Sequence, residues 1–257
     1  MRVIVTRPAR EAQRWVREFQ QRGMDALALP LIDIGPAPDE SAVRKAWARL
    51  HGFDAVMFVS GNAADRFFAL KPDSLPSWPA AATRAWAPGP GTRAALMQAG
   101  VPADAIDDPG EQAAQFDSET LWAQVGSQLG AGQRVLVVRG GGATGQGSGR
   151  DWLATQLVER GVAVETVAAY CRQRPRWAPG QFELARHGAV DGSFWLFSSS
   201  EAIAHLESLL PVQGWTQARA VVTHPRIAKS AKDAGFGVVC LSRPTLPDIV
   251  ASIESIR

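Results

Sequence analysis

The middle of the chain, Arg134 to Arg174, contains a strand–turn–helix–strand pattern that the N-terminus repeats, and this repeat restricts the fold most strongly. The apolar run Val135–Val138 ends at Arg139 and a glycine-rich turn, and a helical spacing follows. A second apolar run, Val162–Val167, leads into Tyr170, the only tyrosine of the chain. Strands that alternate with helices at this spacing predict parallel β-sheets with helices on both faces.

The N-terminal copy begins with the run Val3–Val5, passes through Thr6-Arg7-Pro8 into a helical spacing, and reaches a second strand pattern at Ala26–Ile32. Two further pairs of segments match in the same order along the chain. MFVSGNA (57–63) matches LFSSSEA (196–202), and GPGTRAALMQAG (89–100) matches HPRIAKSAKDAG (224–235). Three matched pairs in one order predict the tandem duplication of an α/β half.

Several element boundaries follow from the same patterns. Glycines at the ends of helical spacings, among them Gly23, Gly100 and Gly161, are placed to terminate helices. The spacing after the long glycine-rich turn predicts a helix with Trp152, Leu153 and Leu157 on one face. Another helix is predicted through Leu121, Trp122, Val125 and Leu129.

A linker-like segment follows the first strand–helix–strand unit of each half, at Asp33–Glu40 and at Ala168–Pro179. If the chain crosses between domains at both points, the N-terminal unit joins the C-terminal part of the chain. The two crossing segments would run in opposite directions and could pair. We therefore expect a discontinuous first domain of residues 1–34 and 175–257, a second domain of 40–166, and a linker formed by 35–39 and 167–174.

Composition excludes several classes of function. The chain has 257 residues, of which 46% are hydrophobic and 20% charged, and its net charge of +2 argues against a general nucleic-acid binder. Two cysteines and four scattered histidines form neither a disulfide framework nor a zinc-site spacing. The absence of a long apolar segment predicts a protein without a signal peptide or membrane span, located in the cytoplasm.

Arginine greatly outnumbers lysine among the basic residues, since only four are Lys. The guanidinium group binds carboxylates and phosphates through two parallel hydrogen bonds, which is consistent with an anionic ligand. A GC-rich genome produces the same bias, and we favour that explanation for the composition as a whole.

In an open parallel sheet, ligands bind beyond the carboxyl ends of the strands, so the residues that follow the strand patterns form the candidate site. They are small, polar and rich in glycine, and most precede a helix, whose N-terminal N–H groups attract anions. A simpler explanation for each Ser, Thr or Asn is that it caps its helix. The candidate residues are Thr6-Arg7, Ser60-Gly61-Asn62, Gly89-Pro90-Gly91-Thr92, Arg139-Gly140, Ser198-Ser199-Ser200 and His224-Pro225-Arg226.

The glycine-rich turn also satisfies a dinucleotide-binding pattern. Gly140, Gly142 and Gly145 give GxGxxG after a strand, and Glu165 lies at the separation expected of a ribose-binding acid. A run so rich in glycine matches many patterns by chance, and the helix is predicted to begin only near Asp151. We therefore favour a flexible insertion at 143–148. A phosphate-binding P-loop is excluded, because no Lys follows the glycines.

Tyr170 and His224 are the two titratable residues singled out near the expected site. The phenol of Tyr170 can donate a proton or a hydrogen bond at neutral pH, although an aromatic that merely packs on a linker strand explains it equally well. His224 is the only histidine at the end of a strand that faces the expected cleft.

Taken in order, these segments resemble the uroporphyrinogen-III synthase family. The ordered set, rather than any one motif, carries the resemblance, which covers nearly the whole chain. It consists of TRP after the first strand, FVSGNA, the GPGT start of a helix, a strand that ends in RG, GVAVETVAAYCR and FSSSEA.

The resemblance implies two flavodoxin-like, three-layer α/β domains with parallel sheets, joined by a two-stranded linker, the first domain being completed by the C-terminal part. It also implies a cyclising lyase of tetrapyrrole (haem) biosynthesis. Such an enzyme removes the hydroxyl group of the linear tetrapyrrole hydroxymethylbilane and closes the ring with inversion of ring D. The product, uroporphyrinogen III, forms through a spiro intermediate without a metal or an organic cofactor.

The same resemblance assigns roles to residues. The family's linker tyrosine, which would protonate the leaving hydroxide, matches Tyr170. The substrate carries eight carboxylates, which loop N–H groups, hydroxyls and arginines can hold in one pose. The expected enzyme is a cytoplasmic monomer that binds neither nucleic acid nor membrane and transiently contacts the bilane-forming enzyme. Residues expected to line the cleft by this analogy are Arg7, Ser60, Asn62, Gly89, Thr92, Arg139, Arg150 and Ser199.

The chain departs from the family pattern in two loops. Residues Gly141–Gly149 lengthen a loop that is short in the family, and Arg150 is taken as the match to its Gly-Arg pair. His224 and Ile227 replace a Gly and a Thr, so that His224 would supply a donor in place of the lost hydroxyl. Two other functions are kept as alternatives: a non-catalytic two-domain module that binds or senses a small anion, and a nicotinamide-dependent enzyme.

Overall fold

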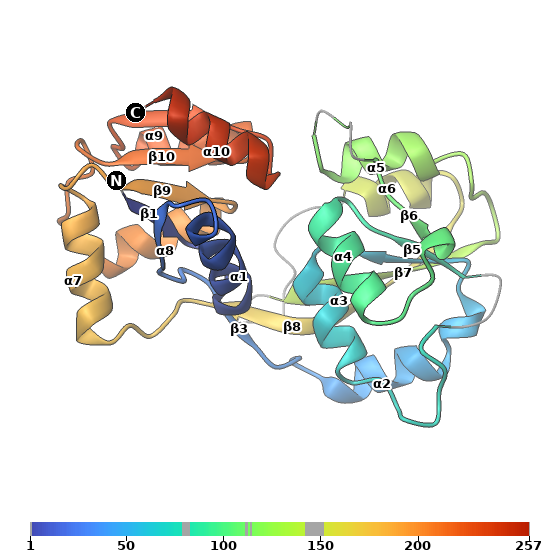
Figure 1. Cartoon of the computed structure of the whole chain (residues 1–257). Coiled ribbons are helices and arrows are strands. Elements are labelled where there is room, and N and C mark those ends of the chain that lie inside the picture. Colours follow the sequence, from blue (N-terminus) through green and yellow to red (C-terminus); the bar gives the residue numbers. More distant parts are fainter. Residues whose placement is uncertain (1, 79–82, 111–112, 114, 142–151, 257) are drawn as a thin grey trace. The chain divides into compact units, whose positions relative to one another are not determined.

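The structure is a computed structural model that describes residues 2–78, 83–110, 113, 115–141 and 152–256. The chain divides into two compact units (Figure 1). Unit 1 consists of Met1–Asp33 and Gln173–Arg257, and unit 2 consists of Ile34–Arg172. Arg150 and residues 142–149 of the glycine-rich turn lie outside the described residues.

Unit 1 contains a five-stranded parallel sheet in the order β11-β10-β9-β1-β2. Val3 and Val5 of β1 pack on one face against α1 and α10, whereas Ile4 and Trp195 contact α7 on the other face. The strands are β1 (Arg2–Val5), β2 (Asp25–Ala28), β9 (Phe194–Phe197), β10 (Arg219–Val222) and β11 (Val238–Leu241). The helices are α1 (Ala9–Gln20), α7 (Pro179–Gly188), α8 (Ser200–Leu209), α9 (Pro225–Asp233) and α10 (Leu246–Ser255).

Unit 2 contains a six-stranded sheet in the order β3-β8-β7-β4-β5-β6, with β4 to β8 parallel. Helices α2, α3 and α4 cover one face and α5 and α6 the other. The strands are β3 (Asp33–Gly35), β4 (Ala55–Phe58), β5 (Arg84–Trp86), β6 (Ile106–Asp107), β7 (Arg134–Gly141) and β8 (Ala163–Gln173). The helices are α2 (Glu40–Ala48), α3 (Gly61–Phe68), α4 (Pro90–Gln98), α5 (Ser118–Val125) and α6 (Trp152–Glu159), with 3-10 turns η1 (Leu50–Gly52) and η2 (Ala103–Ala105).

The strand registers confirm the duplication that the sequence predicts. Val3 lies opposite Phe194 in unit 1, as Val135 lies opposite Ala55 in unit 2. The matched segments after β4 and β9, and those after β5 and β10, likewise start from equivalent positions. The expected parallel α/β sheets are therefore present in both units, and equivalent carboxyl edges can be compared residue by residue.

Four helices, two in each unit, end at the predicted glycines or at a matched one. The positive φ angles are 75° at Gly23, 77° at Gly161, 91° at Gly100 and 89° at Gly235. At each end, the backbone N–H of the residue after the glycine donates a hydrogen bond to a carbonyl oxygen near the end of the helix, for example from Val162 to Leu157 O at 3.1 Å. This left-handed conformation is open to glycine at little cost, which is why the sequence pattern locates these ends so well.

One predicted strand end is wrong, whereas the expected pairing of the linker segments is present. The strand expected at Ala26–Ile32 ends at Ala28, although the N–H groups of Leu29 and Leu31 still donate to Val5 O at 2.9 Å and to Thr6 O at 3.1 Å. The first linker segment contains the short strand β3 (Asp33–Gly35) beside β8, and the Cys171 N–H donates to Pro36 O at 3.1 Å, so the two crossing segments pair as expected.

Two predicted helices also differ from the structure. The helix expected to reach Leu129 ends at Val125, because Gly126 disfavours helix and a turn follows it. Trp152 does not share the buried face of Leu153 and Leu157, since it lies one position, about 100°, around the helix and is 39% exposed.

Among the described residues, no helix combines the length and the apolar character that a membrane span requires. The same part of the chain contains no group of three or more His, Cys, Asp or Glu side chains arranged to hold a metal ion.

Candidate functional site

The carboxyl edge of unit 2 brings a residue of β8 into contact with a residue that follows β4. Ser60 follows β4 and caps α3, where its Oγ accepts a hydrogen bond from the Ala63 N–H at 3.2 Å. The Tyr170 hydroxyl lies 3.2 Å from the same Oγ, although the two residues are 110 positions apart. The sequence proposed both residues separately, and the structure places them in contact.

The ring of Tyr170 packs against the backbone of Gly140 on the neighbouring strand β7. A Cβ atom added at Gly140 would lie 2.5 Å from the ring carbon Cζ of Tyr170 and 2.9 Å from its hydroxyl oxygen. Only 3% of Tyr170 is exposed, and the residue belongs to the core cluster of unit 2. The packing explanation for Tyr170 therefore holds for its ring, while its hydroxyl reaches a polar partner at the edge.

The N-termini of α3 and α4 lie close together at this edge. A Cβ atom at Gly61 would lie 3.3 Å from the carbonyl oxygen of Gly91 in the first turn of α4. Gly89 has an extended backbone and caps α4, and a Cβ atom added to it would lie 3.0 Å from the Cβ of Phe116. Thr92, in contrast, is buried beneath the helix start, which suits packing better than contact with a ligand.

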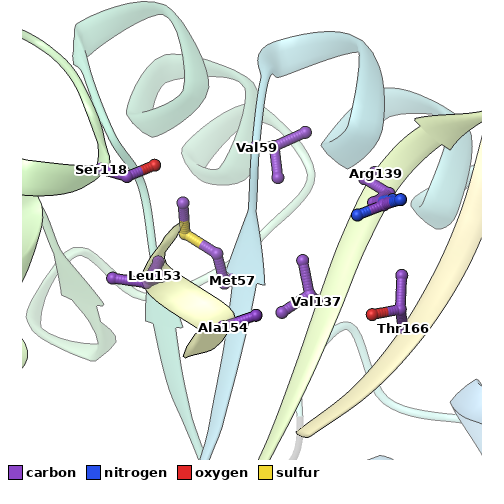
Figure 2. Close-up of a pocket in the computed structure, with 8 residues that line it drawn as sticks. All are labelled: Met57, Val59, Ser118, Val137, Arg139, Leu153, Ala154 and Thr166. Atoms are coloured by element: carbon purple, nitrogen blue, oxygen red, sulfur yellow. The ribbon is translucent and has the colours of Figure 1, made fainter. Parts of the chain in front are cut away.

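Arg139 lies on the opposite face of the sheet from Tyr170. It lines a small pocket between the sheet and α6, together with Thr166 of β8 (Figure 2). The structure therefore separates two residues that the sequence grouped at one site. The pocket is lined by Met57, Val59, Ser118, Val137, Arg139, Leu153, Ala154 and Thr166.

The carboxyl edge of unit 1 contains a half-buried arginine, Arg7. The Arg7 guanidinium donates from Nη1 to Glu11 Oε2 at 3.1 Å and lies 4.6 Å above the centre of the Trp15 ring. Burial lowers the pKa of Arg7, and the neighbouring Glu11 carboxylate acts in the opposite direction. Arg7 is thus held by its own helix, and its buried Nε has no hydrogen-bond partner among the residues that the structure describes.

Two other strand ends in unit 1 begin helices with side-chain caps. Ser199 Oγ accepts from the Glu201 N–H at 3.2 Å at the start of α8. His224 Nδ1 accepts from the Arg226 N–H at 3.1 Å at the start of α9, which requires this nitrogen to be unprotonated. Ser60 and Ser199 therefore cap their helices, as the simpler explanation anticipated, and His224 does so as well.

Glu165 does not lie where a ribose-binding acid would be needed. Its carboxylate pairs with Arg134 at the first residue of β7 and with Arg49 at 3.1 Å, at the amino end of the strands. The hydrogen bond from Arg134 lowers the pKa of Glu165, and Arg49 adds to this effect. Gly140 lies at the other end of β7, so the dinucleotide pattern in the sequence does not correspond to one site.

Sequence reasoning missed the contact between Gly140 and Tyr170. A glycine after a strand has many explanations, and nothing in the spacing indicates which side chain will cover it. The shift in register that produces the contact, between Arg139 and Gly140, also leaves no mark in the sequence.

Comparison with known proteins gives one family. A family model described as "Uroporphyrinogen-III synthase HemD" matches residues 13–251. A curated "Uroporphyrinogen-III synthase" from Chlorobaculum parvum is 30% identical over 142 residues, which are 54% of this chain and 52% of that protein. The matched region thus spans about half the length of this relative.

Solved structures show the same fold. A mutant uroporphyrinogen III synthase from Thermus thermophilus has a TM-score of 0.56 at 17% identity, over 100% of this chain and 97% of that chain. A uroporphyrinogen-III synthetase from Helicobacter pylori has the same TM-score and identity, over 100% of both chains. With a family model that matches nearly all of its length, the chain belongs to the uroporphyrinogen-III synthase family.

Proposed function

We propose that this chain is a uroporphyrinogen-III synthase that converts hydroxymethylbilane into uroporphyrinogen III and water, with inversion of ring D. The observation that carries the proposal is the family match over residues 13–251. The edge of unit 2 supports it, because a lone phenol and a helix-capping serine lie in hydrogen-bond contact there.

We assign substrate binding to the residues at the carboxyl edges. The first turns of α3 and α4 direct N–H groups outward, and their partial positive charge favours carboxylates. In unit 2 the proposed binding residues are Ser60, Asn62, Gly89, Pro90, Gly91, Gly140 and Arg150, whereas the buried Thr92 and Arg139 on the other face of the sheet are left out. In unit 1 they are Arg7, Ser198, Ser199, His224 and Arg226.

Tyr170 is the proposed acid. Its phenol gives a proton to the hydroxyl group that leaves the bilane, the C–O bond breaks, and water departs. Attack by ring D and closure of the macrocycle then release a proton from carbon, which restores the phenol. A transient phenolate would lie beside Ser60 and the N-terminus of α3, where N–H groups stabilise negative charge.

The low exposure of Tyr170 sets a condition on this mechanism. Since 3% of the residue is exposed, the substrate must reach the hydroxyl from the side of Ser60, which is half-buried. We include in the proposal that substrate binding widens this edge. We also propose that the protein is a cytoplasmic monomer that transiently contacts the bilane-forming enzyme. Light scattering tests the monomeric state.

The decisive experiment is incubation with hydroxymethylbilane followed by separation of the product isomers. The proposal predicts mainly the type III isomer. The type I isomer forms spontaneously, so its exclusive formation would instead favour a module that binds an anion without chemistry. Thermal stabilisation by a nicotinamide dinucleotide would favour a nicotinamide-dependent enzyme.

A further inference from the structure

The direction in which Tyr170 points does not follow from the alternation of its strand. Val164 and Thr166 of β8 face α5 and α6, whereas Val167 and Ala169 face α2 and α3. Side chains alternate along a regular strand, so a regular β8 would turn Tyr170 to the same face as Thr166. The phenol would then point toward the pocket that contains Arg139, away from Ser60.

An extra residue in β8 reverses this direction. Arg139 lies opposite Ala168, but its neighbour Gly140 lies opposite Tyr170, so Ala169 has no partner on β7. Such a β-bulge places two consecutive side chains on one side of the sheet and re-aims the residues beyond it. Ala169 and Tyr170 accordingly both belong to the core cluster that contains α2 and α3.

The absence of a side chain at Gly140 then determines how close the ring can approach β7. The ring atoms Cζ and Cε2 of Tyr170 lie only 2.5 Å and 2.7 Å from the place where a Cβ atom of Gly140 would be. Real Cβ atoms do not tolerate such distances, so any other residue would push the ring outward. In its present position the ring carries its hydroxyl to 3.2 Å from Ser60 Oγ.

We propose that Gly140 is a positioning residue for Tyr170: the bulge at Ala169 turns the phenol to the Ser60 side of the sheet, and Gly140 lets the ring lie flat on β7 with its hydroxyl beside Ser60. The catalytic part of this inference rests on the proposed function. The geometric part stands independently, because the position of the ring can be observed without any reaction.

The test uses the single tyrosine of the chain as a probe. Full-length protein labelled with ¹³C in the tyrosine ring gives NMR signals from Tyr170 alone. Gly140→Ala is compared with Gly130→Ala, a matched control in unit 2 whose Cβ would meet nothing within 4 Å. We expect Gly140→Ala to shift the ring signals and Gly130→Ala to leave them in place.

The kinetic readout separates positioning from general damage. A displacement of about 1 Å at a reacting group costs about 10²-fold in rate, so kcat of Gly140→Ala should fall by about that factor, with a much smaller change in KM. In a Tyr170→Phe background the same substitution should lower kcat little further. Unchanged ring signals in Gly140→Ala would overturn the inference.

Two further variants cover the remaining outcomes. If Gly140→Ala fails to fold alone, Gly140→Ala combined with Tyr170→Ala should fold as Tyr170→Ala does, because the truncated side chain no longer collides. If that double variant also failed to fold, the strand β7 itself would require Gly140, and the ring of Tyr170 would not be the reason for the glycine. Should Tyr170→Phe keep the wild-type rate, the acid role would be wrong, while the ring signals would still decide the role of Gly140.

Discussion

The two units share one sheet design but differ at the carboxyl end of one pair of equivalent strands, β1 in unit 1 and β7 in unit 2. In unit 1, β1 ends at Val5, and α1 begins within four residues, after Arg7 and Pro8. In unit 2, the equivalent Arg139 and Gly140 remain in β7, and Tyr170 of the longer strand β8 covers the glycine. Two sheets with the same registers can thus differ at a single strand end, and in unit 2 that end packs against the ring of Tyr170.

The capping residues show the same contrast on a smaller scale. Ser60 and Ser199 occupy matching positions and both cap a helix, but only Ser60 also contacts a phenol. At the next strand end, Gly89 caps α4 in unit 2 without a side-chain hydrogen bond, whereas the matching His224 in unit 1 caps α9 through its ring nitrogen. The shared edge of each unit is therefore a row of helix starts, and the phenol belongs to unit 2 alone.

The largest stability difference between the units is expected at the matched glycines that end helices. Gly23→Ala and Gly161→Ala each force a positive φ on an alanine, which costs about 1–2 kcal/mol. Gly161→Ala should cost about 1 kcal/mol more, because its Cβ would lie 3.1 Å from Ala131 Cβ, whereas Gly23 has nothing within 4 Å. Urea unfolding, with hydrogen exchange to assign the loss to a unit, measures both.

The pair Gly100 and Gly235 repeats this experiment at a second position. A Cβ at Gly100 would lie 3.1 Å from Ser77 Cβ, and one at Gly235 would meet nothing within 4 Å. The larger loss should again occur in unit 2. Equal losses within both pairs would contradict the idea that unit 2 is the more tightly packed copy at its helix ends.

A smaller effect is expected from the two matched serine caps. Ser60→Ala and Ser199→Ala each remove a hydrogen bond to the first turn and should lower stability by about 1 kcal/mol. The enzyme kinetics should differ, because Ser60→Ala removes the partner of Tyr170 and lowers kcat, whereas Ser199→Ala raises KM. Similar changes in kcat for both variants would show that the phenol contact gives Ser60 no special role.

The smallest effect concerns acid stability. The pKa of Glu165 is lowered in the folded protein by Arg134 and Arg49, so its ion pairs stabilise the fold above the unfolded pKa of about 4.3 and are lost as the pH falls through the lower, folded value. The Glu165 side chain is 36% exposed, so we expect these ion pairs to contribute less than about 1 kcal/mol. Leu27 occupies the matching position in unit 1.

Glu165→Gln tests whether the ion pairs of Glu165 stabilise unit 2, by urea unfolding near neutral pH and in acid. The variant should be less stable than the wild type near neutral pH, with the two converging in acid. Hydrogen exchange should assign the loss to unit 2. A deficit that persists unchanged in acid would mean that the ion pairs are not its cause.

The repeated patterns made much of the fold predictable from sequence. Apolar runs such as Val135–Val138, helix-ending glycines such as Gly23 and matched segments such as 57–63 and 196–202 each correspond to local physical requirements. Buried parallel strands need continuous apolar residues, and left-handed helix ends favour glycine. These requirements act within a few residues, so the sequence displays them directly.

The candidate site was predictable only as a set of loops. Ser60 and Tyr170 were both identified, but their contact depends on the unpaired Ala169 and on a bare backbone at Gly140. A bulge is a property of two strands and leaves no periodic signal in either one. The same reason explains why Arg139 was grouped with residues from which the sheet separates it.

The most direct measurement of the central claim is the single-turnover rate at which Tyr170→Phe forms type III product, with protein in excess over hydroxymethylbilane. If the edge of unit 2 performs the chemistry, loss of the phenol should slow this step by about 10²–10⁴-fold, while substrate affinity stays close to that of the wild type. A variant that forms the type III isomer at the wild-type rate would contradict the assignment of the reaction to Tyr170.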